Sequence, residues 1–274
     1  MDNRPIGFFD SGLGGLTCIT PLMKRLPEEK MIYFGDTART PYGSKATDTI
    51  KSFSNEIAEW LVSKDVKMIV IACNTVSATC VDELRERFPQ IPIVGIIEPA
   101  AKRVSEVCSE DNNIGIIGTK VTIASGAYEK FVHSYNDKLS IYQTPCPAYV
   151  PLIEEGIIKN DIMDLTIKYY MDDFVKNNNL DTVILGCTHY PLIKENISRI
   201  YPELNILNPS DIIVDTIEEI LTEKDALAKD SHAENVFYAS DLSENFLRMI
   251  DSIFEGESED AKVKFKNFDL EKGE

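Results

Sequence analysis

Short apolar runs separated by stretches of helical length are the feature that most constrains the fold of this chain. Each run is apolar at consecutive positions, whereas a strand with one solvated face would alternate apolar and polar residues. Strands of this kind occur in parallel sheets that helices cover on both faces. The runs are IGFFD, MIYFGD, KMIVIAC, IPIVGII, NIGIIG, LSIYQTP, TVILGC, LNILNP and NVFYAS. The sequence therefore predicts an α/β fold with mainly parallel sheets.

Two of the intervening stretches have the apolar periodicity of amphipathic helices. Residues 48–64 predict a helix whose buried face consists of Ile50, Phe53, Ile57, Trp60 and Leu61. Residues 161–177 predict a second helix, with a buried face that consists of Ile162, Leu165, Tyr169 and Phe174. The acidic stretch 255–262 predicts a solvated turn or loop.

The same strand, loop and helix plan occurs twice. MIVIACNTVSA at 68–78 is similar to TVILGCTHYPL at 182–192, and IGFFDSGLGG at 6–15 is similar to IGIIGTKVTIASGAY at 114–128. Such a duplication predicts two similar, pseudosymmetric α/β lobes. Ligands of open α/β sheets bind beyond the carboxyl ends of the strands, so we expect an active site in a cleft between the lobes.

Cys73 and Cys187 occupy the same place in their two repeats. Each follows a predicted buried strand and precedes a predicted helix, whose N-terminal partial charge favours thiolate over thiol and lowers the cysteine pKa. A buried cysteine with only a structural role is the alternative for each residue taken singly. Because the context is duplicated, we interpret the pair as functional.

Two thiols that face one another suit a proton transfer that inverts a carbon centre. One thiol removes a proton from one face of the carbon, the other delivers a proton to the opposite face, and the roles exchange with direction. A disulfide reductase would have its cysteines within bonding distance, and a thiol protease would combine one cysteine with a histidine. The sequence therefore predicts a racemase that works without a metal or an organic cofactor.

Hydroxyl, amide and imidazole groups surround the two cysteines. Side chains of this kind and the backbone N–H groups of a helix start can hold a carboxylate, although a hydroxyl in such a place can also be a simple helix cap. The predicted carboxylate ligands are Asn74, Thr75, Thr119, Thr122, Thr188 and His189. His189 is also near enough in sequence to tune the protonation of Cys187.

The glycine-rich segment DSGLGGL at 10–16 follows the first predicted strand. Its spacing is neither that of a dinucleotide fingerprint nor that of a P-loop. We interpret Asp10 as the partner of an ammonium group, with Ser11 beside it; the alternative is that Asp10 forms a turn. Glu154 is a possible supporting acid behind the site, or else belongs to a solvated helix face.

Charge and hydropathy argue against a nucleic-acid-binding protein and against a membrane protein. Asp and Glu outnumber Lys and Arg by 45 to 28, and the formal charge of −17 would repel a phosphate backbone, so nucleic acid is not an expected partner. No leader pattern and no apolar run of membrane-spanning length is found, so we expect a cytoplasmic chain with no membrane association. Its six cysteines then stay free thiols.

Five motifs in this order resemble those of glutamate racemases, in the aspartate/glutamate racemase superfamily, and the similarity runs almost end to end. The motifs are DSGLGGL (10–16), GDTARTPYG (35–43), CNTVSA (73–78), GTKVTIASGAY (118–128) and GCTHYPL (186–192). The resemblance implies a cofactor-independent enzyme that interconverts L- and D-glutamate and supplies D-glutamate for peptidoglycan. It implies Cys73 and Cys187 as the acid/base pair, and it adds Tyr42 and Gly43 to the substrate contacts.

The resemblance also implies a domain organisation and an oligomeric state. The first lobe would be discontinuous, with residues 1–97 and 210–274, the second lobe would contain residues 98–209, and the assembly would be a homodimer. A related racemase that acts on aspartate or a similar amino acid, and a non-catalytic amino-acid-binding protein, are the alternatives that the residues leave open.

Overall fold

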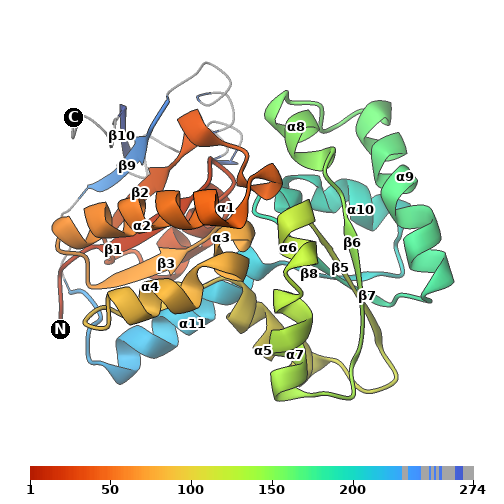
Figure 1. Ribbon diagram of the computed structural model, residues 1–274, viewed down its shortest axis with the longest axis horizontal. Coiled ribbons are helices and arrows are strands. Elements are labelled where there is room, and N and C mark those ends of the chain that lie inside the picture. The colour runs from red at the N-terminus through yellow and green to blue at the C-terminus, as the bar shows by residue number, and fades with distance from the viewer. Residues whose placement is uncertain (230–233, 242–246, 248–249, 251–252, 255–262, 268–274) are drawn as a thin grey trace.

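Two parallel sheets with flanking helices lie side by side in a computed structural model of the chain (Figure 1). The structure describes residues 1–229, 234–241, 247, 250, 253–254 and 263–267. The predicted loop at 255–262 lies outside the described residues. The α/β class predicted from the apolar runs is confirmed.

Within the described residues, the first sheet has six strands in the order β10-β9-β2-β1-β3-β4, and every pairing is parallel. The strands are β1 (Ile6–Asp10), β2 (Met31–Gly35), β3 (Met68–Ile71), β4 (Ile93–Gly95), β9 (Asn235–Ala239) and β10 (Val263–Asn267). The side chains of β1 alternate between the two faces, so that Phe8 packs in one apolar cluster and Phe9 in another. This double burial is the reason that residues 6–9, IGFF, are apolar at consecutive positions.

The second sheet, within the same described part of the chain, has four parallel strands in the order β6-β5-β7-β8. These are β5 (Asn113–Gly118), β6 (Ser140–Pro145), β7 (Thr182–Gly186) and β8 (Asn205–Leu207). β5 and β7 are neighbours, and Gly118 pairs with Gly186 at their carboxyl ends. The loops after these two strands therefore begin side by side.

Helices cover the faces of both sheets. The α-helices are α1 (Leu16–Arg25), α2 (Thr47–Ser63), α3 (Asn74–Thr79), α4 (Val81–Arg87), α5 (Ile97–Val107), α6 (Lys120–Ala124), α7 (Ala127–Tyr135), α8 (Tyr149–Glu154), α9 (Asp161–Asn177), α10 (Lys194–Ile200) and α11 (Pro209–Glu223). Short 3₁₀ turns are η1 (Thr37–Arg39), η2 (Tyr42–Ser44) and η3 (Tyr190–Ile193). Among the described residues, no helix combines the length and the apolar character that a bilayer crossing requires.

The chain passes from one sheet to the other twice. It leaves the first sheet through α5, completes the second sheet from β5 to β8, and returns through α11 to β9. α11 packs against both α1 and α5, so the helix of the second crossing contacts the helix of the first. We propose residues 1–97 with 210–274, and residues 98–209, as the two lobes, because these limits fall at the two crossings.

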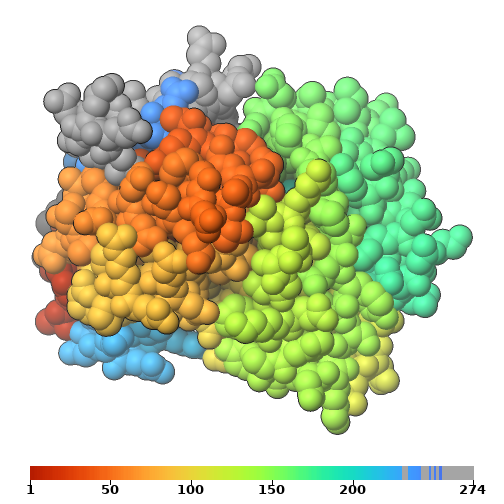
Figure 2. Space-filling view, viewed as in Figure 1, coloured from red at the N-terminus to blue at the C-terminus, as the bar shows by residue number. Residues whose placement is uncertain are grey.

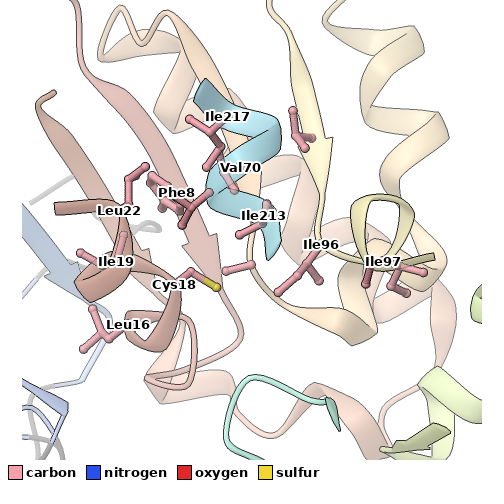
Figure 3. Close-up of a cluster of buried hydrophobic side chains, with 14 of the residues drawn as sticks. Phe8, Leu16, Cys18, Ile19, Leu22, Val70, Ile96, Ile97, Ile213 and Ile217 are labelled. Atoms are coloured by element: carbon pink, nitrogen blue, oxygen red, sulfur yellow. The ribbon is translucent and has the colours of Figure 1, made fainter. Parts of the chain in front are cut away.

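The main core lies between helices α1 and α11 and the strands of the first sheet. Figure 3 shows side chains from α1 and α11 meeting those from β1 and β3, with Ile96 and Ile97 at one end. The labelled members are Phe8, Leu16, Cys18, Ile19, Leu22, Val70, Ile96, Ile97, Ile213 and Ile217. This packing fixes the loops that follow β1 and β3.

The predicted buried face of α9 is wrong for three of its four residues; Phe174 alone is partly buried against the core. Ile162, Leu165 and Tyr169 are 55, 66 and 82% exposed, whereas the buried residues are Met163, Ile167 and Met171. Both sets have helical spacing, so periodicity alone does not say which one faces the sheet. The face predicted for α2 agrees better, since Ile50, Ile57 and Leu61 are buried and Phe53 and Trp60 are partly buried against the same cluster.

Candidate active site

A cavity of about 240 Å³ lies where the loops of the two sheets meet. In the space-filling view, the orange and yellow segment containing α1 to α4 meets the green segment containing α6 to α9 along a seam (Figure 2). Side chains from both segments line the cavity. They are Ser11, Thr40, Pro41, Tyr42, Gly43, Ser44, Cys73, Asn74, Thr75, Thr119, Lys120, Pro147, Val150, Pro151, Cys187, Thr188, His189 and Tyr190.

Cys73 comes from the first sheet, at the point where β3 turns into α3. Its Sγ lies 3.5 Å from Ser11 Oγ, to which it donates. The expectation of a lowered pKa is wrong for Cys73, because burial and the nearby Asp10 charge raise the pKa of this thiol to about 12. Cys73 is therefore a neutral thiol at neutral pH and can donate a proton.

Cys187 comes from the second sheet, directly after β7. Its Sγ lies 3.9 Å from Nδ1 of His189, and Nε2 of that histidine lies 3.1 Å from Glu154 Oε1. Burial alone lowers the pKa of His189, but its hydrogen bonds to Cys187 and Glu154, together with their charges, outweigh burial and raise this pKa to about 10. A cationic imidazole therefore lies beside the Cys187 sulfur at neutral pH.

A cluster of three threonine hydroxyls joins the two sheets on one side of the cavity. Thr75 Oγ1 lies 3.0 Å from Thr119 Oγ1 and 3.3 Å from Thr122 Oγ1, and the last two are 3.0 Å apart. Asn74 accepts a hydrogen bond from Tyr128 through Oδ1, whereas its buried Nδ2 has no protein partner in the described chain. The arrangement offers a row of hydroxyls and one unused amide donor to an anionic group.

Asp10 lies behind the wall of the cavity and is fully buried. Its Oδ1 accepts from Gly12 N at 2.9 Å, and its Oδ2 accepts from Thr188 Oγ1 at 3.2 Å. Burial raises the pKa of Asp10 above its usual value, and the charge of His189 lowers it in part. The Asp10 carboxylate is therefore connected to the cavity by its hydrogen bond with Thr188, and Thr188 lines the cavity.

Tyr42 and Gly43 form a wall that the first sheet contributes. The Tyr42 hydroxyl donates to Asp36 Oδ2, which also accepts from Arg39 Nε at 2.7 Å. A Cβ added to Gly43 would lie 2.5 Å from Thr119 Cβ, so only glycine permits this approach between the two sheets. Asp36 and Arg39 were not identified as supporting residues from the sequence, although both lie inside the motif GDTARTPYG.

The predicted site residues fall into two groups. Ten line the cavity, namely Ser11, Tyr42, Gly43, Cys73, Asn74, Thr75, Thr119, Cys187, Thr188 and His189. Asp10, Thr122 and Glu154 lie behind it and contact lining residues. Lys120 and the apolar residues Pro147, Val150 and Tyr190 were not predicted, because nothing in their local pattern distinguishes them from ordinary helix and loop residues.

Among the residues that the structure describes, no group of three His, Cys, Asp or Glu side chains is placed to hold a metal ion. The chemistry that the cavity offers comes from two thiols, an imidazole paired with a carboxylate, and a row of hydroxyl donors.

Comparison with known proteins gives a family match over most of the chain. The profile of the Asp/Glu/Hydantoin racemase family matches residues 18–217. The chain belongs to this family. Both cysteines of the cavity fall inside the matched range.

Curated members of the racemase family resemble the chain along nearly all of its length. A glutamate racemase of Sulfurihydrogenibium sp. is 46% identical over 84% of this chain and 90% of its own length. A glutamate racemase of Persephonella marina is 40% identical over 90% of this chain and 92% of its own length.

A solved structure of the racemase family has the same architecture. The glutamate racemase of Francisella tularensis, determined in complex with D-glutamate, superposes with a TM-score of 0.91 at 36% identity. The superposition covers 99% of this chain and 100% of the Francisella chain. The arrangement of two sheets is thus shared with an amino-acid racemase that binds its substrate.

Proposed function

We propose that the chain is a cofactor-independent glutamate racemase that transfers protons at Cα with two cysteines. The observation that carries the proposal is the convergence of Cys73 and Cys187, from two different sheets, on one cavity. The names of the relatives support glutamate as the substrate, and the complex of the Francisella enzyme with D-glutamate supports it further.

The surroundings of the two sulfurs support different resting roles for Cys73 and Cys187. The cationic imidazole of His189 is placed to stabilise negative charge on Cys187, which would act as the base toward L-glutamate. Cys73, held as a neutral thiol, would deliver a proton to the opposite face of the carbon. In the D-to-L direction the roles exchange, with Cys73 removing the proton.

Stabilising the carbanion-like transition state is the difficult part of this reaction. Negative charge that develops at Cα spreads toward the α-carboxylate, so donors fixed around that group lower the barrier. We assign the α-carboxylate to the hydroxyls of Thr75 and Thr119, with Thr122 behind them, and to Asn74 Nδ2. The substrate ammonium group would face Ser11 and Thr188, with Asp10 supplying the countercharge.

Isotope exchange tests the proposal. L-Glutamate incubated with the protein in deuterated water should yield D-glutamate that carries deuterium at Cα, detected by NMR and chiral chromatography. The same assay with aspartate and with neutral amino acids should give no product. Binding of glutamate without any exchange would contradict the proposed activity, and faster turnover of aspartate would replace the proposed substrate.

Substitution of either sulfur should abolish the reaction. Cys73→Ala and Cys187→Ala should each lower kcat by at least about 100-fold, since a positioned acid or base contributes that much or more. Cys108→Ala is the matched control, because Cys108 is buried at the end of α5 and does not line the cavity. Full activity in either cavity variant would rule out the two-thiol mechanism.

The proposal includes the cellular role that the resemblance implies. The chain would supply D-glutamate for peptidoglycan synthesis and so for cell shape, in the cytoplasm and as a homodimer. Deleting the gene should make growth dependent on added D-glutamate, and light scattering of the purified protein should give twice the mass of one chain.

A further inference from the structure

Tyr128 connects the two loops that carry the cysteines. It is the second residue of α7, and its side chain is fully buried. Its hydroxyl donates to Asn74 Oδ1 at 2.6 Å, and Asn74 directly follows Cys73 in the chain. Its ring lies against Gly186, directly before Cys187, where an added Cβ would be 3.2 Å from Tyr128 Cε2. One side chain therefore contacts the residue after one thiol and the residue before the other.

The Tyr128 hydroxyl has a single acceptor in the described part of the chain. Burial, together with the charge of Cys187, raises the pKa of Tyr128, so the hydroxyl keeps its proton at neutral pH. That proton is donated to Asn74 Oδ1, and no other described residue accepts it. A buried hydroxyl proton without an acceptor would carry the full cost of its desolvation. The hydroxyl therefore requires the oxygen of the Asn74 amide to face α7.

This requirement decides which way the Asn74 amide is turned. An asparagine amide has an acceptor oxygen and a donor nitrogen, and a half-turn of the group exchanges their places. If Asn74 were turned over, Nδ2 would face Tyr128 and the hydroxyl proton would lose its acceptor. In the observed orientation Nδ2 is buried without a partner in the described chain, and Asn74 lines the cavity. The amide donor that we assign to the α-carboxylate is thus set by a residue outside the cavity lining.

We propose that Tyr128 is a positioning residue for the reaction and holds the Asn74 amide with Nδ2 available to the substrate α-carboxylate. This inference rests on the proposed function and extends it to a residue that does not line the cavity. Negative charge on the α-carboxylate grows in the transition state, so a donor held in one orientation stabilises that state more than it stabilises the bound substrate. The contribution of Tyr128 should therefore appear mainly in kcat.

Tyr128→Phe tests the role, because it removes the hydroxyl and keeps the ring against Gly186. In both directions kcat should fall about tenfold, with KM changed by less than about twofold, since Asn74 loses the hydrogen bond that orients it. Tyr149→Phe is the matched control. Tyr149 is also buried, donates to the carbonyl oxygen of Ile167 at 3.5 Å and does not line the cavity, so kcat should stay unchanged. An equal fall in both variants would overturn the role of Tyr128.

A double-mutant cycle asks whether Tyr128 acts through Asn74. Asn74→Ala should lower kcat roughly 100-fold, since it removes a preorganised donor. Adding Tyr128→Phe to Asn74→Ala should then change kcat by less than about twofold, because no amide is left to orient. A further tenfold loss in this background, or a wild-type kcat in Tyr128→Phe alone, would overturn the inference. Urea unfolding gives the folded fraction of each variant, so that a loss of stability is not counted as a loss of turnover.

NMR of the side-chain amide separates this inference from the proposed activity. In wild-type protein labelled with ¹⁵N-asparagine, the Asn74 amide signal is identified by its absence from Asn74→Ala, and it should shift when D-glutamate saturates the site. An Asn74 signal that bound D-glutamate leaves in place would overturn the role of Tyr128, whatever the activity. A wild-type protein that binds glutamate and shifts this signal without exchanging the Cα proton would overturn the racemase and leave the orientation of Asn74 supported. A wild-type protein that binds no glutamate would overturn both proposals.

Discussion

The pair formed by His189 and Glu154 couples the protonation of the site to the stability of the fold. The pKa of His189 is about 10 in the folded protein and about 6.5 in an unfolded chain. A group whose pKa is raised on folding stabilises the protein fully below its unfolded pKa, and this contribution is lost as pH rises through the folded pKa. The relevant window is therefore pH 6.5 to 10.

We predict that His189→Gln removes this pH dependence. Between pH 7 and 9 the wild-type free energy of unfolding should fall more steeply than that of the variant, by up to about 1.4 kcal/mol for each pH unit. Urea denaturation at pH 7, 8 and 9 measures both slopes, and comparing slopes cancels the titration of groups that the two proteins share. Parallel slopes would contradict a raised histidine pKa.

The residues found from the sequence and those missed differ in where their partners lie. Cys73 and Cys187 could be identified because a duplicated local pattern marks them. Asp36 was missed although its donors Tyr42 and Arg39 are near in sequence, because its full burial and its third donor, Ser240 Oγ at 2.9 Å from 204 residues away, arise only in the folded chain. The pKa of Cys73 was missed for a similar reason: a helix start is a local feature, whereas burial depends on the whole fold.

At the scale of elements, the loop after β1 shows why a glycine is required at one particular position. A Cβ on Gly14 would lie 2.3 Å from Thr188 Oγ1 and 2.6 Å from His189 Nδ1. The loop from the first sheet therefore contacts the cysteine loop of the second sheet directly. Thr17 Oγ1 holds the same contact by donating to the carbonyl oxygen of Thr188 at 3.1 Å.

Gly14→Ala should consequently lower activity more than stability. The added methyl group displaces Thr188 and His189, and a shift of about 1 Å at a catalytic loop can cost roughly 100-fold in rate. Gly126→Ala is the control: it lies at φ +65° with open space around it, so it should cost about 1–2 kcal/mol of stability and leave turnover unchanged. Isotope exchange and urea unfolding of both variants check this, and a fully active Gly14→Ala would exclude close loop contact.

Helix α9 provides a second prediction, because it has two apolar stripes and only one of them is buried. Ile167→Ala should cost about 2–5 kcal/mol of unfolding free energy, since it leaves a cavity in the core of the second sheet. Leu165→Ala should change it by less than about 0.5 kcal/mol, because Leu165 is 66% exposed. The urea unfolding midpoints of the two variants measure these changes in unfolding free energy. Equal costs would mean that the exposed stripe is covered in solution.

Most of the strands were predictable for a physical reason, whereas the edge strand β10 was not. The central strands β1, β3 and β7 are buried at every position and so read as apolar runs in the sequence. β10 lies at the edge of the first sheet and has the sequence VKFKN, in which lysines alternate with apolar residues. Lysine is common on edge strands because it discourages pairing with other chains, and it also hides such a strand from a search for apolar runs.

On the scale of the whole molecule, a buried ion pair joins segments from both ends of the chain. Lys67 Nζ lies 2.6 Å from Glu29 Oε2, and both side chains are at most 2% exposed. The same ammonium donates to the carbonyl oxygens of Asp2 at 2.7 Å and Ala226 at 2.8 Å. Glu29 Oε1 in turn accepts from the backbone N–H of Ala228 at 2.8 Å. The pair therefore fixes the N-terminal segment and the segment after α11 against the start of β3.

Removing one partner should be far more harmful than removing both. Lys67→Met leaves the Glu29 carboxylate buried without a countercharge, and we expect a loss of about 3–5 kcal/mol in unfolding free energy. The double variant Lys67→Met with Glu29→Met buries two apolar side chains of similar length and should recover most of that loss. Because the pair lies at the amino ends of the strands, opposite the cavity, kcat of the folded fraction should stay unchanged in both variants. Urea unfolding measures the free energy of unfolding, and isotope exchange measures kcat. If the double variant is as unstable as the single one, the unpaired charge is not the main cost. The lost hydrogen bonds to Asp2, Ala226 and Ala228 would then dominate it.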